Sequence, residues 1–291
     1  MPRFSFSTTG VEVVSAFADQ VQNKTGPSEG GIGAEVAISL AHANPHLLIL
    51  AGRTEGKIQP VIQKIREINA SVRLQFVQLD LSVQASVRHA AEFISATVEK
   101  IDIVINNAAI MACPWSKTED GIESQIINTT STGGLAGEAT FDDVNFQDGK
   151  TYIPVAAYAQ FKAAMMLFSA ALAARFDPRK VAAFSVHPGN IKTNLQVHFQ
   201  DPAAFNSAVE WVISKAGGFQ REEFKTLQQG SSTTLVAALD DTILESSGHY
   251  LADAQLISPQ PPLLTGSSKA VNELWSLSES LVHQEFNFGG H

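Results

Sequence analysis

Cysteine is nearly absent from this chain of 291 residues, which contains only Cys113. An internal disulfide is therefore excluded, and no cluster of cysteine and histidine has metal-ligand spacing, so we expect no metal site and a reducing compartment. No stretch approaches the length of a membrane span, and the opening residues MPRFSFSTTG lack a long apolar core. The sequence thus predicts a cytoplasmic protein without a membrane span.

Basic residues are also few, since 20 lysines and arginines stand against 29 aspartates and glutamates. The formal net charge is -9 and the pI is about 5.3, which argues against binding to nucleic-acid phosphates or anionic membranes. We expect neither partner. At 44% hydrophobic residues, the chain is large enough for one α/β domain with a sizeable core.

Helical and strand patterns alternate along the chain from Gly30 onward. We expect helices at 33–43, 57–68, 83–98 and 156–176, and strands at 46–51, 74–79, 101–106, 126–130 and 181–187. The tail returns to helix and strand patterns at 232–239 and 249–251, with a final helix at 271–283. Alternation of this kind predicts a single α/β domain built on a Rossmann-like, doubly wound parallel sheet.

Between 195 and 229 the periodicity weakens while large apolar residues accumulate, namely Phe199, Phe205, Trp211, Phe219 and Phe224. We expect one or two helices here, forming either a lid over an apolar substrate or a buried satellite cluster. The domain then divides into a cofactor and catalytic core at 25–193, a lid at 194–230, and a C-terminal strand and helix at 231–291.

A glycine-rich turn, TGPSEGGIG at 25–33, opens the first helix of this series. Glycines let the backbone approach a pyrophosphate, which the free N–H groups of a helix N-terminus hold. The next strand ends in AGR, where dinucleotide folds meet the adenosine ribose and an arginine accommodates a 2′-phosphate. Arg53 and Lys57 therefore favour NADP over NAD, with Glu29 as a contrary sign. A solvated loop cation is the alternative for Arg53.

Two more strand ends carry polar groups. Asp80, in LDLS, either accepts the adenine amino group or caps the following helix. The NNAA motif, with Asn107 as its second residue, ends the next predicted strand at the carboxyl edge where open parallel sheets bind ligands.

A serine, a tyrosine and a lysine suggest a proton relay. Ser131 lies in TTSTGG, and Tyr158 and Lys162 lie four residues apart in AYAQFK, so the last two share one helix face. A free tyrosine titrates near about 10, and a neighbouring cation lowers its pKa toward neutrality. Such a phenol can exchange a proton with a carbonyl oxygen. The spacing alone also fits an ordinary amphipathic helix with a solvated lysine.

The ordered set TGPSEGGIG, AGR, LDLS, NNAA, Ser131, YAQFK and HPGNIKT resembles the short-chain dehydrogenase/reductase family, especially its retinol-dehydrogenase-like and WW-domain-oxidoreductase-like members. The resemblance implies an NADP-dependent oxidoreductase that interconverts an alcohol and a ketone or aldehyde on an apolar small molecule. Tyr158 would exchange the proton, Ser131 would hold the substrate oxygen, and Lys162 would lower the tyrosine pKa and bind the nicotinamide ribose.

The same resemblance implies a set of further cofactor contacts, which in chain order are Gly26, Gly31, Ile32, Gly33, Asp80, Asn107, Pro188, Ile191 and Thr193. The residues of the glycine turn would cradle the phosphates. Asp80 would meet adenine, and Asn107 would lie on the adenosine side. The last three would position the nicotinamide ring and its carboxamide.

Two stretches depart from the family pattern. Only Val21 is apolar among residues 19–24, so we expect the buried first strand to be shortened or missing. Between Asn107 and Ser131 the chain has about half of the family's usual length, and the helix that carries a catalytic asparagine and packs in the usual dimer interface has no counterpart. The sequence therefore leaves open whether the protein forms a homo-oligomer.

These departures support a second hypothesis, a catalytically impaired or silent nucleotide-binding homologue that arises from a splice form, an aberrant gene model or decay. A nucleotide-sugar epimerase also pairs Tyr-x-x-x-Lys with a bound dinucleotide. That class usually prefers NAD and a larger C-terminal domain, so it is the least favoured of the three.

Overall fold

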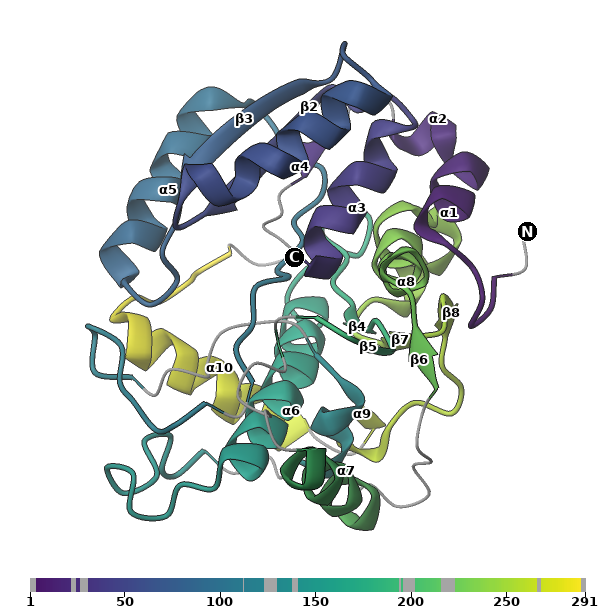
Figure 1. Cartoon of the computed structure of the whole chain (residues 1–291). Helices are drawn as coiled ribbons and strands as arrows, with labels where there is room; N and C mark the ends of the chain where they lie inside the picture. The colour runs from purple at the N-terminus through teal and green to yellow at the C-terminus, as the bar shows by residue number, and fades with distance from the viewer. Residues whose placement is uncertain are drawn as a thin grey trace.

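The computed structural model describes residues 4–21, 25–26, 31–111, 113–122, 130–137, 141–193, 195, 202–215, 223–265 and 268–288. Glu29, Phe199, Phe219 and most of the strand predicted at 126–130 lie outside this set, and the side chain of Phe205 is not described. Two layers of structure stand one above the other in Figure 1, a sheet with its helices above and a mainly helical part below.

The upper part is a parallel sheet in the order β1-β2-β3 with helices on both faces. Its elements are β1 (Thr25–Gly26), α3 (Gly31–Ala41), β2 (Leu47–Gly52), α4 (Glu55–Ile68), β3 (Arg73–Gln78) and α5 (Gln84–Thr97). Alternate residues of β2 face opposite layers, because Leu48 and Leu50 join the main core whereas Leu47 and Ile49 pack with Val77. This two-sided burial confirms the predicted doubly wound α/β fold.

The lower part carries the long helix of the predicted relay. Its elements are η1 (Thr132–Ala136), α6 (Pro154–Ala173), β4 (Ser185–His187), β5 (Asn190–Ile191), α7 (Pro202–Lys215), β6 (Phe224–Lys225), α8 (Leu227–Leu239), η3 (Asp241–Ser246), β7 (Tyr250–Ala252), β8 (Gln255–Leu256), α9 (Pro262–Thr265) and α10 (Ser268–Val282). Strands form the orders β4-β7-β8 and β5-β6. Leu167 and Ala171 of α6 pack against Leu274 and Trp275 of α10, which holds the C-terminal helix in place.

The predicted helices at 33–43, 57–68, 83–98, 156–176 and 271–283 are present with their ends shifted by a few residues. The strand predicted at 181–187 begins only at Ser185, and the strand predicted at 101–106 is wrong. Ile103 is buried, but the side chains of Val104 and Ile101 are 64% and 41% exposed.

The segment before the glycine turn is helical where a doubly wound fold expects its first strand. Helix α2 (Ala18–Val21) occupies the start of this region, and β1 is described at Thr25–Gly26. Residues 22–24 lie outside the described residues, so the predicted shortening of the first strand stays a prediction. A further helix that we did not predict, α1 (Gly10–Ala16), precedes it and begins with a capping box between Thr9 and Glu12.

Helix α6 is, within the described ranges, the one helix long and apolar enough to cross a membrane. We did not expect any such segment. Of its most apolar window, 56% is buried inside the protein, and its two ends pack on other elements of the lower part. The core helix of a globular domain meets the same criteria, so this is weak evidence for a membrane span.

Helix α1 adds a layer over α3 and α8 at a point where only glycine fits. A Cβ atom on Gly10 would lie 2.2 Å from Oγ of Ser231, 2.6 Å from Oγ of Ser39 and 2.9 Å from Cδ1 of Leu235. These neighbours come from both partner helices, so neither can retreat without disturbing the buried contact between them.

We expect Gly10→Ala to lower the free energy of unfolding by about 2 kcal/mol, because the added methyl group overpacks this three-helix contact. Gly56→Ala is the matched control, since a Cβ there meets nothing within 4 Å and Gly56 lies in the first turn of α4. That change should be neutral or stabilise by up to about 1 kcal/mol. Urea unfolding of the three proteins measures both effects; equal midpoints for the two variants would contradict the packing described.

Candidate active site

The predicted relay residues Ser131 and Tyr158 meet where η1 packs on α6. A Cβ on Gly134 would lie 2.8 Å from the carbonyl carbon of Lys162, and one on Gly137 would lie 2.3 Å from the carbonyl oxygen of Ala159. Glycine at these positions therefore lets the two backbones touch. Ser131 caps η1 by accepting a hydrogen bond from the Gly133 N–H at 3.2 Å, and its side chain lies close enough to the phenol of Tyr158 to lower its pKa.

Lys162 lies on the same face of α6 as Tyr158, as the four-residue spacing predicts. Its Nζ lies 5.1 Å from the centroid of the tyrosine ring, and the residue is only 4% exposed. The alternative of a solvated lysine is therefore excluded by its burial.

The charge states of this pair differ from our expectation. Burial raises the pKa of Tyr158 to about 12, and the hydrogen bond from Ser131 opposes that rise without overcoming it. Burial also lowers the pKa of Lys162 to about 7. The predicted lowering of the tyrosine pKa by Lys162 is thus wrong for the protein by itself, because the desolvation of the phenol dominates its pKa.

Two side chains that we did not predict hold this centre. The Thr130 hydroxyl donates to the carbonyl oxygen of Lys162 at 3.0 Å. The backbone N–H of Thr132 donates to Nδ1 of His187 at 3.3 Å, and His187 is buried at the end of β4. The position of His187 directly before the Pro-Gly turn could have identified it as a residue of the site, whereas nothing in the sequence singles out Thr130.

The segment predicted to meet the nicotinamide follows His187 and is tightly fixed. Ile191 of β5 pairs with Lys225 of β6 and is 5% exposed. A Cβ on Gly230 would lie 2.1 Å from Cδ1 of Ile191, so α8 packs directly on this side chain. Pro188 begins the segment and Thr193 ends it, with the Thr193 hydroxyl accepting a hydrogen bond from the Leu195 N–H at 3.2 Å. Pro188 therefore directly follows His187, the residue whose ring nitrogen holds the Ser131 loop.

The predicted phosphate-binding residues gather at the carboxyl end of β1. Gly26 ends that strand, and α3 begins with Gly31, Ile32 and Gly33. Gly31 has a φ of +57°, a backbone conformation that favours glycine. This end of the sheet is where an N-terminal turn of a helix can receive an anion.

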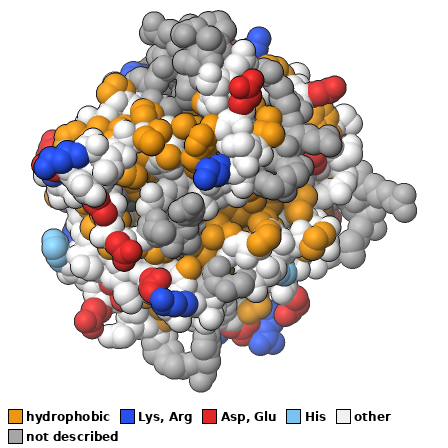
Figure 2. Space-filling model, turned by 90° about the horizontal axis from the view of Figure 1, so that it is seen from below, with side chains coloured by type: hydrophobic (Ala, Val, Ile, Leu, Met, Phe, Trp, Pro, Cys, Tyr) orange, Lys and Arg blue, Asp and Glu red, His pale blue; other side chains and the backbone are white. Residues whose placement is uncertain are grey.

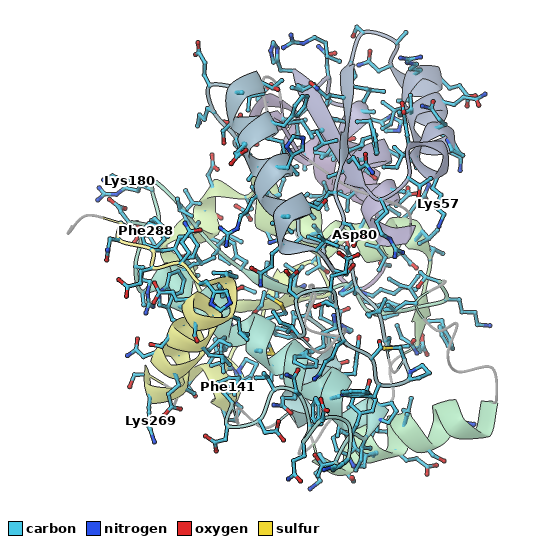
Figure 3. All side chains as sticks on the ribbon, turned by 90° about the vertical axis from the view of Figure 1, so that its left-hand side faces the viewer. Lys57, Asp80, Phe141, Lys180, Lys269 and Phe288 are labelled. Carbon is cyan, nitrogen blue, oxygen red and sulfur yellow. The ribbon has the colours of Figure 1, made fainter. Side chains whose placement is uncertain are left out.

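The predicted adenosine-side residues follow β2 and β3 at the same edge. Arg53 and Lys57 are exposed, and Asp80 directly follows Leu79 after β3. Figure 3 labels Lys57 and Asp80 at the end of the upper part that faces the α6 half. Arg53 is close enough to contribute to the lowered pKa of Asp80. The three residues are thus brought to one edge.

Asp80 forms a turn of its own and does not cap α5. Its Oδ1 accepts hydrogen bonds from the N–H and the hydroxyl of Ser82 at 2.9 and 2.6 Å, and these bonds lower the carboxyl pKa. The first N–H of α5, from Gln84, donates instead to Oδ2 of Asp120 at 2.7 Å. The helix-cap alternative for Asp80 is therefore wrong.

Asn107 is not joined to the other candidate residues by any hydrogen bond of its side chain among the described residues. Its backbone N–H donates to the carbonyl oxygen of Ile105 at 3.1 Å, in the stretch that forms no strand. A hollow of about 910 Å³ lies elsewhere, at the amino ends of β2 and β3 beside His46, Leu47 and Arg73, and contains none of the candidate residues. In the described part of the chain, no cluster of three potential metal ligands occurs.

Comparison with known proteins agrees with this arrangement. The sequence pattern of the family described as short chain dehydrogenase matches residues 25–141. Retinol dehydrogenase 13 of Mus musculus is 30% identical over 87% of this chain and 80% of its own length. The WW domain-containing oxidoreductase of Pongo abelii is 28% identical over 97% of this chain and 73% of its own.

Solved structures share the fold. A short-chain type dehydrogenase/reductase from Mycobacterium marinum superposes with a TM-score of 0.57 at 18% identity, covering 82% of this chain and 96% of its own. At that identity the likeness concerns the fold alone.

The length of one match shows that this chain lacks internal residues which that relative has. The match to the Pongo abelii protein extends over 317 residues, which is more than the 291 residues of the whole chain. That relative therefore carries internal residues that have no counterpart here. By sequence and by fold, the chain belongs to the short-chain dehydrogenase/reductase family, in the group of the retinol dehydrogenases and the WW domain-containing oxidoreductase.

Proposed function

We propose that this chain is an NADP-dependent oxidoreductase that interconverts an alcohol and a ketone or aldehyde on an apolar small molecule. The observation that supports it most is the proximity of the Ser131 hydroxyl to the phenol of Tyr158, with Nζ of Lys162 5.1 Å from the centroid of the phenol ring. A hydroxyl pair of this kind can bind one carbonyl oxygen and protonate it.

The proposed mechanism gives each residue one task. Ser131 holds the substrate oxygen, and Tyr158 donates its proton to that oxygen during reduction or accepts it during oxidation. The bound cofactor supplies or takes up the hydride. A phenol with a pKa of about 12 keeps its proton until the oxygen becomes basic, which suits the reducing direction. Lys162 then lies close enough to stabilise the negative charge that remains on the phenolate of Tyr158.

We assign the cofactor to the edge formed by the glycine turn and the ends of β2 and β3. The backbone at Gly26, Gly31, Ile32 and Gly33 would hold the phosphates, with Asp80 and Asn107 on the adenosine side and Pro188, Ile191 and Thr193 on the nicotinamide side. Arg53 is exposed and forms no ion pair with another described residue, so its guanidinium is open to a phosphate. An arginine followed by Lys57 favours the 2′-phosphate of NADP over the free ribose of NAD.

The substrate would lie between the relay and α7. Helix α7 packs on η1, directly after Ser131, which supports the proposal that the 194–230 region covers the site as a lid on the 25–193 core. The remainder, 231–291, braces the core. Trp211 of α7 is half-buried, and Figure 2 shows apolar side chains gathered on the face nearest α7. We propose that the substrate is an apolar molecule and that the protein acts in the cytoplasm.

The second candidate is a catalytically silent dinucleotide-binding homologue. It is supported by the absence of a strand at 101–106 and of any helix among the described residues from 101 to 130. Asn128, the nearest asparagine before Ser131, lies outside the described residues. Binding of NADPH without turnover would favour this candidate over the enzyme.

We expect the purified chain to oxidise NADPH with a panel of apolar aldehydes and ketones, and Tyr158→Phe to reduce that turnover by about 100-fold or more because the proton donor is lost. The absorbance of NADPH reports the rate. Tyr152→Phe is the matched control, since its hydroxyl donates to the carbonyl oxygen of Cys113 at 2.8 Å and has no task in the reaction. Full turnover by Tyr158→Phe would remove Tyr158 as the acid.

We expect Arg53→Ala to weaken NADPH binding by about tenfold to a hundredfold and to leave NADH binding nearly unchanged, because a charged hydrogen bond to the 2′-phosphate is lost. Fluorescence titration of each cofactor measures the two dissociation constants. Arg66→Ala, an exposed arginine on α4, controls for general charge. Equal losses for NADPH and NADH would contradict the assignment of Arg53.

The cofactor-free protein should gain stability as the pH rises from 7 to 9. The folded pKa of Lys162, about 7, lies below its unfolded value of 10.5, so unfolding takes up a proton throughout this window. The gain is on the order of 2 kcal/mol. Tyr158, raised from 10.0 to about 12, acts only above pH 10.

Lys162→Met should be more stable than the parent at pH 7 and should lose this rise, because it removes the buried amine and keeps an apolar side chain of similar length. Urea unfolding at pH 7, 8 and 9 is the measurement. A parallel rise in both proteins would mean that another group causes it.

A further inference from the structure

Lys225 is fully buried, with its side chain 0% exposed. Its Nζ lies 2.5 Å from Oδ1 of Asp253 and 4.6 Å from the centroid of the Phe6 ring. Burying the ammonium group removes its hydration, and an ion pair with the half-exposed Asp253 carboxylate offsets that loss only in part. The presence of an ammonium group at this place therefore points to a task other than stability.

The stem of Lys225 lies against the segment that follows His187. A Cβ on Gly189 would come within 2.6 Å of Cδ and 3.0 Å of Cε of Lys225, so the lysine stem covers this peptide directly. Gly189 has a φ of +96°, which only glycine adopts without strain. Through the β5–β6 pairing, Lys225 also lies opposite Ile191. One side chain thus limits the movement of both Gly189 and Ile191.

The partner of the ammonium group is held in an unusual conformation. Asp253 and Ala254 form the turn between β7 and β8 with φ values of +52° and +58°. Such turns favour glycine or asparagine, and other residues adopt the conformation at some expense of free energy. The Ala254 N–H donates to the hydroxyl of Thr233 at 3.0 Å, which fixes the turn on α8 and keeps the Asp253 carboxylate beside Lys225.

The N-terminal segment closes the remaining side. The Phe6 ring covers the ammonium group, and the side-chain amide of Gln255 donates to the carbonyl oxygen of Phe4. Phe4 packs in turn on Phe17 with ring centroids 5.7 Å apart. The β7–β8 turn and the N-terminus therefore meet at Lys225, on the far side of the Gly189 peptide.

We propose that Lys225 is a positioning residue that holds the 188–193 segment in the conformation that binds the nicotinamide half of the cofactor. The proposal rests on the proposed function, since it assigns that segment to the cofactor site. Lys225 acts through Gly189 and Ile191 and does not itself touch the cofactor. Its ion pair with Asp253 fixes the stem, and the stem fixes the segment.

The test compares two ligands on the purified full-length chain. NADPH carries a nicotinamide half, whereas 2′,5′-ADP carries only the adenosine and the 2′-phosphate. Lys225→Met keeps the length of the stem and removes the charge, and the half-exposed Asp253 carboxylate is left partly hydrated. We expect this variant to bind NADPH about tenfold more weakly and 2′,5′-ADP as tightly as the parent does.

Lys117→Met is the matched control. Lys117 also pairs with an aspartate, Asp148, and lies over an aromatic ring, with Nζ 5.7 Å from the centroid of Trp115, but it is remote in sequence from the 188–193 segment. It should leave both dissociation constants unchanged. Asp253→Asn provides a second route to the same pair without changing the stem, and it should produce a smaller loss for NADPH alone.

A purely structural role would give a different result. Equal losses for NADPH and 2′,5′-ADP in Lys225→Met and Asp253→Asn, together with a lower melting temperature, would overturn the proposal, as would unchanged binding of NADPH. Failure of the parent chain to bind either ligand would instead overturn the proposed function, and this proposal with it.

Discussion

The backbone contact between η1 and α6 is the constraint on which the candidate site depends. Gly134 and Gly137 let the backbones of η1 and α6 come so close that any side chain at these positions would collide with the backbone of α6. That approach brings Ser131 to Tyr158, and the helical repeat then brings Lys162 to the same face. His187 fixes the loop from the opposite side through Nδ1. The positions of the reactive side chains therefore depend on glycine residues that take no part in the reaction themselves.

The burial that assembles the relay also determines its charge. Tyr158 and Lys162 both lose hydration, and each is pushed toward its neutral form, with a pKa of about 12 for the phenol and about 7 for the amine. A sequence shows which groups are neighbours but not how much water they keep, so the spacing predicted the contact and not the direction of the tyrosine shift. The developing negative charge on a substrate oxygen then meets a proton donor and no fixed anion.

Prediction from sequence succeeded where local pattern and packing agree. The helices α3 to α6 and α10 follow their apolar periodicity, and the relay residues share a face because four residues complete about one turn. It failed where the outcome depends on partners distant in sequence. The N-terminus of α5 is capped by Asp120, which lies 36 residues from Gln84, and not by Asp80. The ion pair between the buried Lys225 and the half-exposed Asp253 joins residues 28 positions apart, and the sequence around each residue gives no sign of it.

The two short regions of the chain affect the two halves of the site unequally. Ser131, Tyr158 and Lys162 are held by η1, α6 and β4, through the close approach of Gly134 and Gly137 and the hydrogen bonds of Thr130 and His187. The glycine turn, in contrast, follows directly on β1, and Asn107 belongs to a stretch that forms no strand although Ile103 is buried in the main core. The exposed Val104 marks the place where the upper sheet ends early. Any loss of function in this chain should therefore arise in the affinity for the cofactor before it arises in the proton transfer.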